Sequence, residues 1–298
     1  MATSRHWVLP LLFGVWTLLN PAVSDAAPGD HPPFYKISYQ GQQAYLLGSI
    51  HIGRDDFYPM AEQIESALEK ATALVVEVDI ENADVASLLR RYAMSPYSMK
   101  QDPDNPSAQR LQQYCDDNKA ICKALSGYSH WMQATQLSLM RFKLLGYQPE
   151  FGVDQTLVMK NASRPVIELE SAEFQFQLLS SFEPQIQWNM LLDAIEIPDS
   201  EMLALVSAWR TGDEAELERL ITGKIEQDED KQILEKMLWQ RNLTMSQKIA
   251  EIMTASANKG PLFIVVGAGH VVGEKGIPVK MEQLFDAKVQ NCWQQHCL

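Results

Sequence analysis

The sequence predicts an α/β fold in which a central, mostly parallel sheet carries a large helical insertion between its early and late strands. Three observations lead to this prediction. Apolar runs of strand length occur near both ends of the chain. A helix-length segment separates the first core strand from the next, which is the spacing of a βαβ unit with parallel strands. Between the early and late runs, apolar residues recur at three- and four-residue intervals, which indicates helices.

The first part of the chain supplies the predicted βαβ unit. Residues 34–39 and 43–47 are expected to pair as a hairpin across a glycine-containing turn. Pro59 is expected to open a helix that runs to about Lys70, because proline suits the first helical turn and apolar residues follow on one face. Residues 73–79, ALVVEVD, are typical of a short strand buried in a parallel sheet.

The rest of the chain is expected to be mainly helical. The helices are expected at 84–93, 108–123 and 130–145, from 152, from 171, and almost throughout 183–258, with a short one in the tail from 278. The remaining strands are expected at 165–169, at 262–266 and, as an edge strand, at 288–293. This order places a helical layer between the early and late strands of one sheet.

The N-terminal segment resembles an export signal. The stretch from Val8 to Leu19 is apolar and is followed by small residues at cleavage spacing. It is shorter than the roughly 20 residues that cross a bilayer. We therefore expect residues 1–26 to be a cleaved signal peptide and residues 27–298 to be a single domain. The mature protein is expected to be periplasmic or secreted, without stable membrane insertion.

Composition narrows the class of partner. The chain has 25 basic and 38 acidic residues, a formal net charge of −13, and 46% hydrophobic residues. This is a globular composition, and its negative charge repels a phosphate backbone. Nucleic-acid binding is therefore disfavoured, and the expected partner is a peptide or small-molecule substrate.

The four cysteines form two pairs that are close in sequence. Cys115 stands near Cys122, and Cys292 stands near Cys297. Four cysteines allow three connectivities, of which we favour the local one. A continuous helix would hold Cys115 and Cys122 about 10 Å apart, so the chain must turn between them if they are bonded. We expect these cysteines to form disulfides that stabilise the fold in an oxidising compartment.

Ionisable side chains gather where the predicted core strands end. In open parallel sheets the carboxyl ends of the strands line the crevice where ligands bind. Two imidazoles with a carboxylate at that edge are a ligand set for a catalytic divalent metal. The side chains at or just beyond the strand ends are His51, Glu77, Asp79, Glu168, Glu170 and His270.

A repeated motif singles out the two histidines. Gly48 precedes His51 by three residues, and Gly267 precedes His270 by the same spacing, each after an apolar run. One such histidine would usually be a structural hydrogen-bonding residue, but the duplication favours a shared site. The sequence contains no H-E-x-x-H helix and no G-x-S-x-G elbow.

Together these motifs resemble the TraB/GumN family, which is related to the TIKI metalloproteases and, more distantly, to erythromycin esterase-like and ChaN-like proteins. The resemblance covers roughly residues 34–290, through YLLGSIHIG, VVEVD, FGVDQ, IELESAEFQ, QRNLTMSQKI and VVGAGHVVGEKG. It implies that the two Gly-x-x-His motifs and Glu77 are family elements. The other implied site residues are Asp154, Glu170 with Gln175, and Arg241 with Asn242.

The resemblance and the motifs lead to one main functional expectation, an exported metal-dependent hydrolase that acts on peptide bonds. His51, Glu77 and His270 are expected to bind a divalent transition metal ion. Glu170 is expected to act as general base or to orient a ligand, and Arg241 to stabilise the oxyanion. Asp79 alternates onto the same strand face as Glu77 and is expected either to support the site from there or only to cap the following turn.

Two alternatives come from other functional classes. A ChaN-like relative would use the same cleft to bind haem or another ligand without catalysis. A metal-free esterase would use a histidine as general base, oriented by Glu77.

Overall fold

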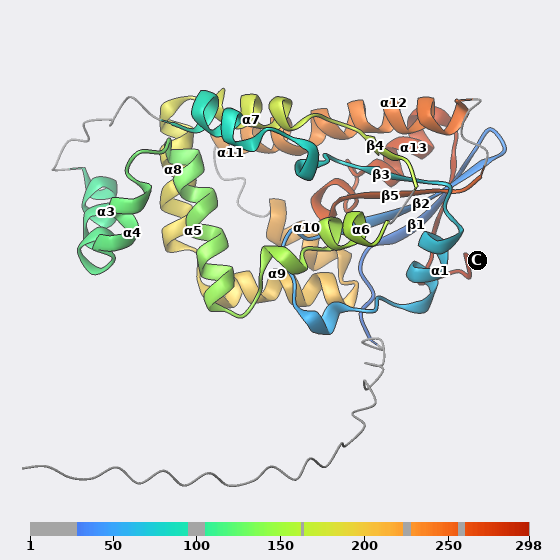
Figure 1. Ribbon diagram of the computed structural model, residues 1–298, viewed down its shortest axis with the longest axis horizontal. Coiled ribbons are helices and arrows are strands. Elements are labelled where there is room, and N and C mark those ends of the chain that lie inside the picture. The colour runs from blue at the N-terminus through green and yellow to red at the C-terminus, as the bar shows by residue number, and fades with distance from the viewer. Residues whose placement is uncertain (1–28, 95–104, 162–163, 223–227, 256–259, 298) are drawn as a thin grey trace, which may run out of the picture.

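The computed structural model describes residues 29–94, 105–161, 164–222, 228–255 and 260–297 (Figure 1). One mixed sheet forms the centre of the α/β part. Helices cover both of its faces, and further helices extend from the carboxyl ends of its parallel strands. The predicted fold class is therefore confirmed.

The sheet has six strands in the order β4-β3-β5-β2-β1-β6. The four strands β4, β3, β5 and β2 run parallel, and β1 and β6 are antiparallel additions at one edge. The late strand β5 is inserted between the two early strands β2 and β3. The strands are β1 (Phe34–Tyr39), β2 (Gln42–Ser49), β3 (Ala73–Val76), β4 (Val166–Glu168), β5 (Leu262–Gly267) and β6 (Lys288–Asn291).

The central strands are apolar on both faces because each face is covered. Phe263 and Val265 of β5 belong to one buried cluster, whereas Ile264 and Val266 belong to the other. Helices α1, α6 and α9 pack into the first cluster, and α12 and α13 pack into the second. A continuous apolar run is therefore the expected pattern for β5.

The helices divide into those that cover the sheet and those that form the insertion. Helices α5 and α8 pack side by side at a distance from the sheet (Figure 1). The α-helices are α1 (Glu62–Lys70), α2 (Val85–Leu88), α3 (Pro106–Asp117), α4 (Lys119–Leu125), α5 (His130–Leu144), α6 (Val153–Lys160), α7 (Ala172–Ser180), α8 (Pro184–Glu196), α9 (Asp199–Thr211), α10 (Glu214–Thr222), α11 (Asp228–Leu234), α12 (Gln240–Thr254) and α13 (Ile277–Phe285). A π-helical turn, η5 (Glu235–Trp239), joins α11 to α12, and a 3-10 turn, η6 (Ala268–His270), follows β5.

Three predicted boundaries are wrong. The helix expected from Pro59 begins at Glu62, because Ala61 is its non-helical N-cap and the Glu65 side chain accepts the N–H of Met60. The strand expected over 73–79 ends at Val76. The helix expected over 108–123 is two helices.

The break between α3 and α4 lies at Asn118, whose backbone leaves the helical region. The side-chain amide of Asn118 donates to the Tyr114 carbonyl, which the end of α3 leaves without a helical partner. This turn brings Cys115 and Cys122 to a Cα separation of 5.6 Å, and they form a disulfide. The predicted local pairing is confirmed.

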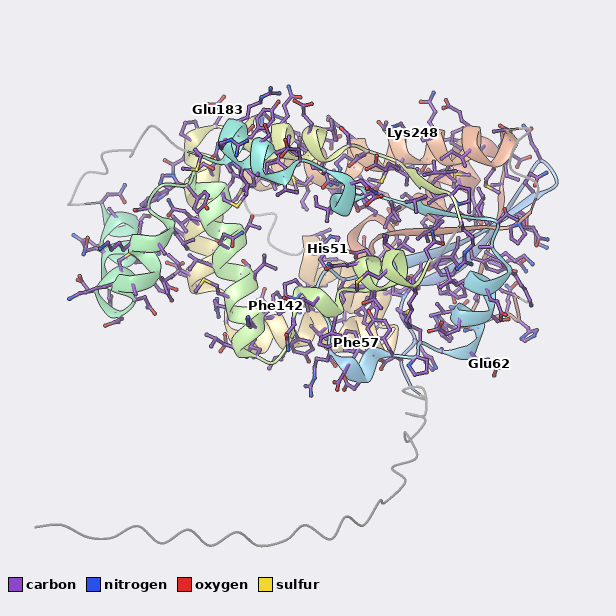
Figure 2. All side chains as sticks on the ribbon, viewed as in Figure 1. His51, Phe57, Glu62, Phe142, Glu183 and Lys248 are labelled. Atoms are coloured by element: carbon purple, nitrogen blue, oxygen red, sulfur yellow. A yellow bond between two sulfur atoms is a disulfide. The ribbon has the colours of Figure 1, made fainter. Side chains whose placement is uncertain are left out.

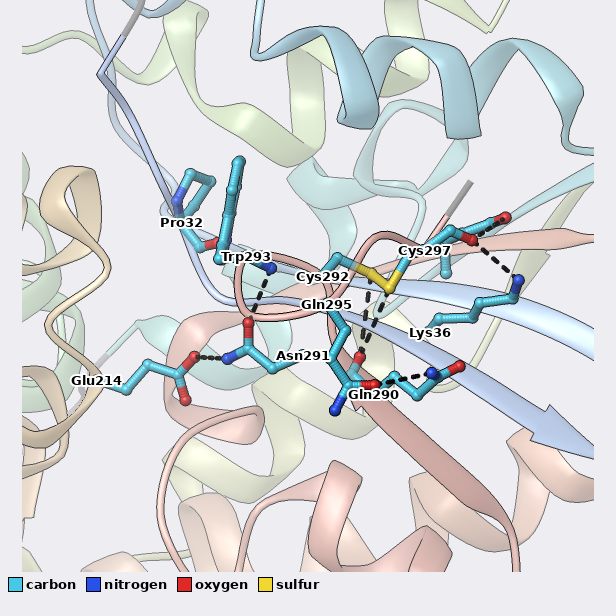
Figure 3. The surroundings of a disulfide bond; sticks show 10 residues. Pro32, Lys36, Glu214, Gln290, Asn291, Cys292, Trp293, Gln295 and Cys297 are labelled. Atoms are coloured by element: carbon cyan, nitrogen blue, oxygen red, sulfur yellow. Dashed lines mark hydrogen bonds between the residues drawn. A yellow bond between two sulfur atoms is a disulfide. The ribbon is translucent and has the colours of Figure 1, made fainter.

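The second disulfide, Cys292–Cys297, closes the C-terminal tail (Figure 3). The Lys36 ammonium of β1 donates to the Cys297 carbonyl at 2.9 Å. The Trp293 indole donates to the Pro32 carbonyl at 2.6 Å. The tail is thereby attached to the segment that leads into the sheet.

Among the described residues, no helix combines the length and the apolar character that a membrane span requires. The predicted signal peptide, residues 1–26, lies outside the described residues.

Candidate functional site

The strand order brings distant parts of the chain to one edge of the sheet. His51 follows β2, Glu77 follows β3 and His270 ends the η6 turn after β5. Because β5 lies between β2 and β3, the end of β5 lies between the other two strand ends. Residue Ser49 pairs with Gly267 in the β2–β5 register, so the two Gly-x-x-His turns leave the sheet at the same level.

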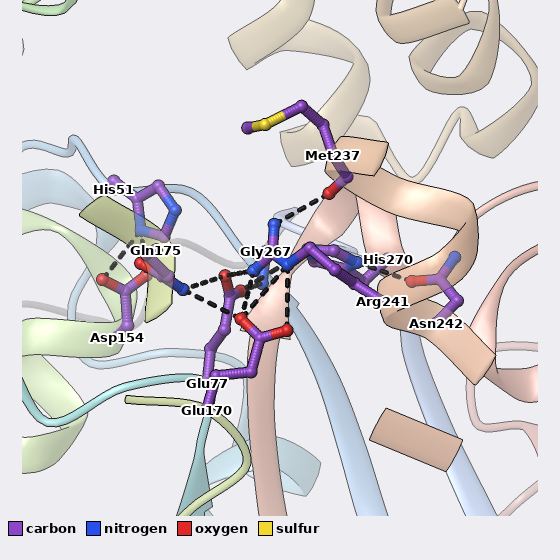
Figure 4. Close-up of polar contacts among 10 residues, drawn as sticks. All are labelled: His51, Glu77, Asp154, Glu170, Gln175, Met237, Arg241, Asn242, Gly267 and His270. Atoms are coloured by element: carbon purple, nitrogen blue, oxygen red, sulfur yellow. Dashed lines mark hydrogen bonds and ion pairs between the residues drawn. The ribbon is translucent and has the colours of Figure 1, made fainter. Parts of the chain in front are cut away.

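The three side chains converge on the α-carbon of Gly267 (Figure 4). A Cβ atom placed on Gly267 would lie 3.6 Å from Glu77 Oε2, 3.7 Å from His270 Cδ2 and 3.8 Å from His51 Nε2. The absence of a side chain at this position leaves room between the imidazoles and the carboxylate. We call this space the Gly267 point.

His51 is oriented by a carboxylate. Its Nδ1 atom lies 3.0 Å from both oxygens of Asp154, which stands in the first turn of α6. The negative charge of Asp154 raises the pKa of His51 to about 9. The Nδ1–H group donates to Asp154, so Nε2 faces the Gly267 point. The side chain is 66% exposed, although it lies within a cavity.

His270 is oriented by a neutral amide. Its Nδ1 atom lies 2.5 Å from Asn242 Oδ1, and the amide nitrogen of Asn242 donates to the Lys275 carbonyl at 2.8 Å. His270 is 4% exposed, and its burial lowers its pKa to about 4. The imidazole is therefore neutral near pH 7, with the proton on Nδ1 and the lone pair on Nε2.

Glu77 belongs to a buried cluster of charged side chains. The Arg241 guanidinium donates to Glu170 at 2.9 and 2.7 Å and to the Met237 carbonyl at 2.7 Å, and it also pairs with Glu77 Oε1. Burial by itself would raise the pKa of Glu77, but His270, Arg241 and His51 around it lower that pKa to about 2. Glu77 is therefore an anion whose Oε1 is engaged by Arg241.

Further hydrogen bonds fix the orientation of this cluster. The Gln175 side chain donates to Glu77 Oε1 at 2.8 Å and to Glu170 Oε2 at 3.3 Å. The N–H of Gly267 donates to Glu77 Oε2 at 3.2 Å. Gln175 and Arg241 thus hold Oε1, whereas Oε2, which accepts the Gly267 N–H, is the carboxylate oxygen that lies at the Gly267 point.

The structure brings together most of the predicted site residues, but not all of them. Asp79 and Glu168 form a separate contact, in which Glu168 Oε1 accepts the N–H of Asp79 at 2.8 Å. Asp79 directly precedes the 3-10 turn Ile80–Asn82, and its side chain accepts a hydrogen bond from the Asn82 amide, so it bonds the turn that follows β3. Gly48 packs beneath the site, and its carbonyl accepts the Trp209 indole N–H at 2.8 Å.

The cluster forms one wall of a cavity of about 790 Å³. His51, Glu77, Gln175, Arg241 and His270 line it, whereas Glu170 does not. Figure 2 shows His51 on the sheet side of this space and Phe142 of α5 across it. The apolar cavity residues of α5, α7, α8, α9, α10 and η5 were not predicted from the sequence. Their apolar helical spacing is also that of core residues, so the sequence held no separate signal for them.

The donor set has the chemistry of a metal site. Among the described residues, no group of three or more His, Cys, Asp or Glu side chains is already arranged to hold a metal ion. Two donors that share one transition metal ion at about 2.1 Å each lie no more than about 4 Å apart. His270 Nε2 and Glu77 Oε2 are 3.7 Å apart. Acceptors bound to Nδ1 of both imidazoles are the usual support for metal-binding histidines. The donor types, and the separation between His270 and Glu77, therefore suit a divalent metal ion.

Comparisons with known proteins agree with the motifs. The chain is 25% identical over 291 residues to the uncharacterized protein YbaP of Escherichia coli (strain K12), covering 91% of this chain and 98% of the relative. It is 24% identical over 276 residues to YbaP of Shigella flexneri, covering 87% and 90% of the two chains. No solved structure matches the chain. The model of the TraB/PrgY/gumN family matches residues 33–284. The protein therefore belongs to the TraB/PrgY/gumN family.

Proposed function

We propose that this protein is a hydrolase that uses a divalent transition metal ion bound by His51, Glu77 and His270. The observation that carries the proposal is the convergence of two imidazoles and one carboxylate oxygen on the Gly267 point. Such an ion would supply Lewis acidity and a nucleophile derived from water at neutral pH.

The surrounding residues would hold the three proposed ligands in fixed orientations. Asp154 and Asn242 hold the Nδ1 atoms of His51 and His270, so both Nε2 atoms are presented to one place. Arg241 and the N–H of Gly267 each engage one oxygen of Glu77 and hold its carboxylate in a single orientation. Preorganised donors of this kind lose little freedom when a ligand binds.

Arg241 and Glu170 have different positions relative to the cavity. Arg241 lines it and would polarise a substrate carbonyl there, in addition to holding Glu77. Glu170 does not line the cavity, so we propose that it positions Arg241 rather than acting as the general base. The substrate would be a carbonyl compound, and the TIKI-like resemblance makes peptides the first class to assay.

The test measures metal content and turnover in the same preparations. We expect the purified protein to retain a divalent metal by elemental analysis and to cleave members of a mixed peptide and ester library. His51→Ala and His270→Ala should lose both properties. His296→Ala, an exposed position in the tail, should lose neither. Full metal binding and turnover in either site variant would refute the assignment.

A second candidate function is hydrolysis without a metal. An imidazole whose Nδ1–H group is held by a carboxylate, as in the His51–Asp154 pair, is also the arrangement of a general base in metal-free hydrolases, and with a pKa of about 9 His51 would be mostly free to accept a proton only at alkaline pH. Turnover that survives exhaustive chelation, and that is lost in Asp154→Ala, would favour this mechanism over the metal-dependent one.

We also propose that the protein is exported. Two disulfides in the mature chain support an oxidising compartment. Fractionation of the producing cells and N-terminal sequencing of the mature protein test this. Retention of residues 1–26 on a cytosolic protein would contradict it.

A further inference from the structure

The cavity in front of the candidate site has one polar wall and several apolar walls. The polar wall is the sheet edge that carries His51, Glu77 and His270. The other walls come from the helical insertion and from η5. Their apolar side chains include Leu178 of α7, Ile197 after α8, Leu205 of α9, Ile221 of α10, and Met237 and Leu238 of η5.

We infer that this cavity binds a linear aliphatic acyl group as the apolar part of the substrate, with the acyl carbonyl at the Gly267 point. The inference rests on the proposed hydrolase function and names the substrate class of the same site. The bond broken would be the ester or amide bond of the acyl group. Water adds its hydroxyl to the acyl carbon and its proton to the leaving alcohol or amine, so no other reactant is needed.

Several apolar residues face the cavity without a core partner. Ile197, Met237 and Leu238 are only partly buried, and they do not belong to the buried clusters of the described residues or pack against them. Their remaining apolar surface lines the cavity. Apolar cavity surface of this kind next to a few convergent polar groups is typical of a ligand site.

The apolar wall reaches the reactive groups themselves. A Cβ atom on Gly269 would lie 3.3 Å from Leu238 Cδ2 and 3.6 Å from Ile221 Cδ1. Gly269 stands directly before His270, so these two side chains pack against the turn that presents the imidazole. A substrate whose carbonyl lies at the Gly267 point would therefore meet apolar surface immediately beside that carbonyl.

The walls suit an aliphatic chain better than a peptide. Each peptide unit brings an N–H and a carbonyl that must be paired when they leave water. The cavity walls are mostly helices, whose backbone groups are already bonded within the helix. Apart from Gln175 and Arg241 of the Glu77 cluster, the polar groups that the helices bring to the cavity are the Trp131 indole and the side chains of Thr135, Ser138 and Asp193, and the Thr135 hydroxyl already donates to the Trp131 carbonyl. An aliphatic chain has no polar groups to leave unpaired.

The experiment compares acyl chain lengths. We would measure kcat/KM of the purified protein for p-nitrophenyl esters from acetate to decanoate, and for the matching acyl anilides. Burying one methylene stabilises the bound state enough to raise kcat/KM up to about fourfold, so octanoate should exceed butyrate by on the order of 100-fold. A series that is flat, or that falls with length, would overturn the inference.

A matched pair of variants tests whether the dependence on acyl length arises in this cavity. Leu238→Asn places a polar group in the cavity wall and should reduce the octanoate-to-butyrate ratio at least tenfold, mainly through KM. Leu243→Asn makes the same change on the exposed side of α12, where Leu243 is 46% exposed, and should leave the ratio unchanged. Equal octanoate-to-butyrate ratios in the two variants would overturn the assignment of the acyl chain to this cavity.

A binding measurement separates this inference from the proposed function. Calorimetric titration with butyrate, octanoate and decanoate should give tighter binding with length, lost in Leu238→Asn. Length-dependent binding without turnover of any ester or amide would support the acyl cavity and overturn hydrolysis. Turnover without length dependence would support hydrolysis and overturn the acyl cavity. A hydrophobic tripeptide that binds as tightly as decanoate would overturn the choice of an aliphatic chain.

Discussion

The two Gly-x-x-His turns share a local sequence but differ in their surroundings. His51 is open to the cavity, and a carboxylate, Asp154, holds it. His270 is buried, and a neutral amide, Asn242, holds it. Without a metal, one imidazole is protonated at neutral pH and the other is not, because their pKa values shift in opposite directions.

The site therefore has two halves, one buried and one open to the cavity. The buried half, formed by His270, Asn242, Arg241 and Glu170, is continuous with the packed interior. The open half, formed by His51 and Asp154, is the side that a ligand can reach. We therefore expect changes in the buried half to affect folding, and changes in the open half to affect ligand binding and protonation.

The largest expected effect is the loss of Arg241. Arg241→Met would leave the buried carboxylates of Glu77 and Glu170 without their cation and should lower the free energy of unfolding by about 3–5 kcal/mol. Urea denaturation measures this. The control is Arg219→Met, which removes an exposed ion pair with Glu216 and should have no measurable effect. Equal stability of the two variants would show that the buried half does not support the fold.

Asn242→Leu is expected to have the next largest effect. The substitution keeps the approximate side-chain volume but leaves the Nδ1–H of His270 and the Lys275 carbonyl without their partner. Each buried polar group left unpaired costs about 1–3 kcal/mol. Gln247→Leu on the exposed side of the same helix is the control for thermal and urea unfolding. A stability equal to that of the control would contradict the description of His270 as a fixed residue.

The two motif glycines should respond differently to the same methyl group. In Gly48→Ala the new Cβ would lie 3.2 Å from Ala268 Cα and 3.2 Å from Pro33 Cβ, so the variant should lose about 1–3 kcal/mol of stability through overpacking. In Gly267→Ala the nearest atoms are 3.6–3.8 Å away, which is ordinary contact, but they are the site atoms themselves.

Gly267→Ala should therefore fold normally and lose metal binding and turnover. Unfolding curves and elemental analysis of both variants test the pair. Gly127→Ala, whose new Cβ would have Met94 Cε as its nearest neighbour at 3.7 Å, serves as the neutral control. Metal binding by Gly267→Ala at the level of the unmodified protein would argue against a ligand at the Gly267 point.

The smallest effect on stability is expected for Asp154→Asn in the open half. Removing the carboxylate charge removes the main cause of the raised pKa of His51, which should fall from about 9 toward the ordinary value for histidine. The variant would therefore lose the imidazole proton at lower pH than the unmodified protein. An NMR titration of both histidines in chelator-treated protein measures this. The pKa of His270 should remain low, and an equal change at both would contradict the two-half description.

Local sequence patterns predicted well the strands that carry the site. The runs before Gly48 and Gly267 are apolar at every position because β2 and β5 are covered on both faces, and this is visible without coordinates. The same patterns failed at segments where the course of the backbone depends on side-chain contacts outside the regular helices and strands. The Asp79 side chain bonds Asn82 in the turn after β3, and α3 stops at Asn118 because its own side chain bonds the end of the helix.

The strands, the histidines at their ends and the two cysteine pairs can be predicted from the chain alone, because they depend on short-range hydrophobic spacing and on residue type. The packing of distant segments, in contrast, inserts β5 between β2 and β3, brings Asp154 to His51, and lets Arg241 join Glu77 to Glu170. It also decided that apolar helix faces, among them Met237 and Leu238, line a cavity. The physical reason is that an apolar residue is favoured equally by a core and by an apolar binding site, and only the packing of distant helices distinguishes the two.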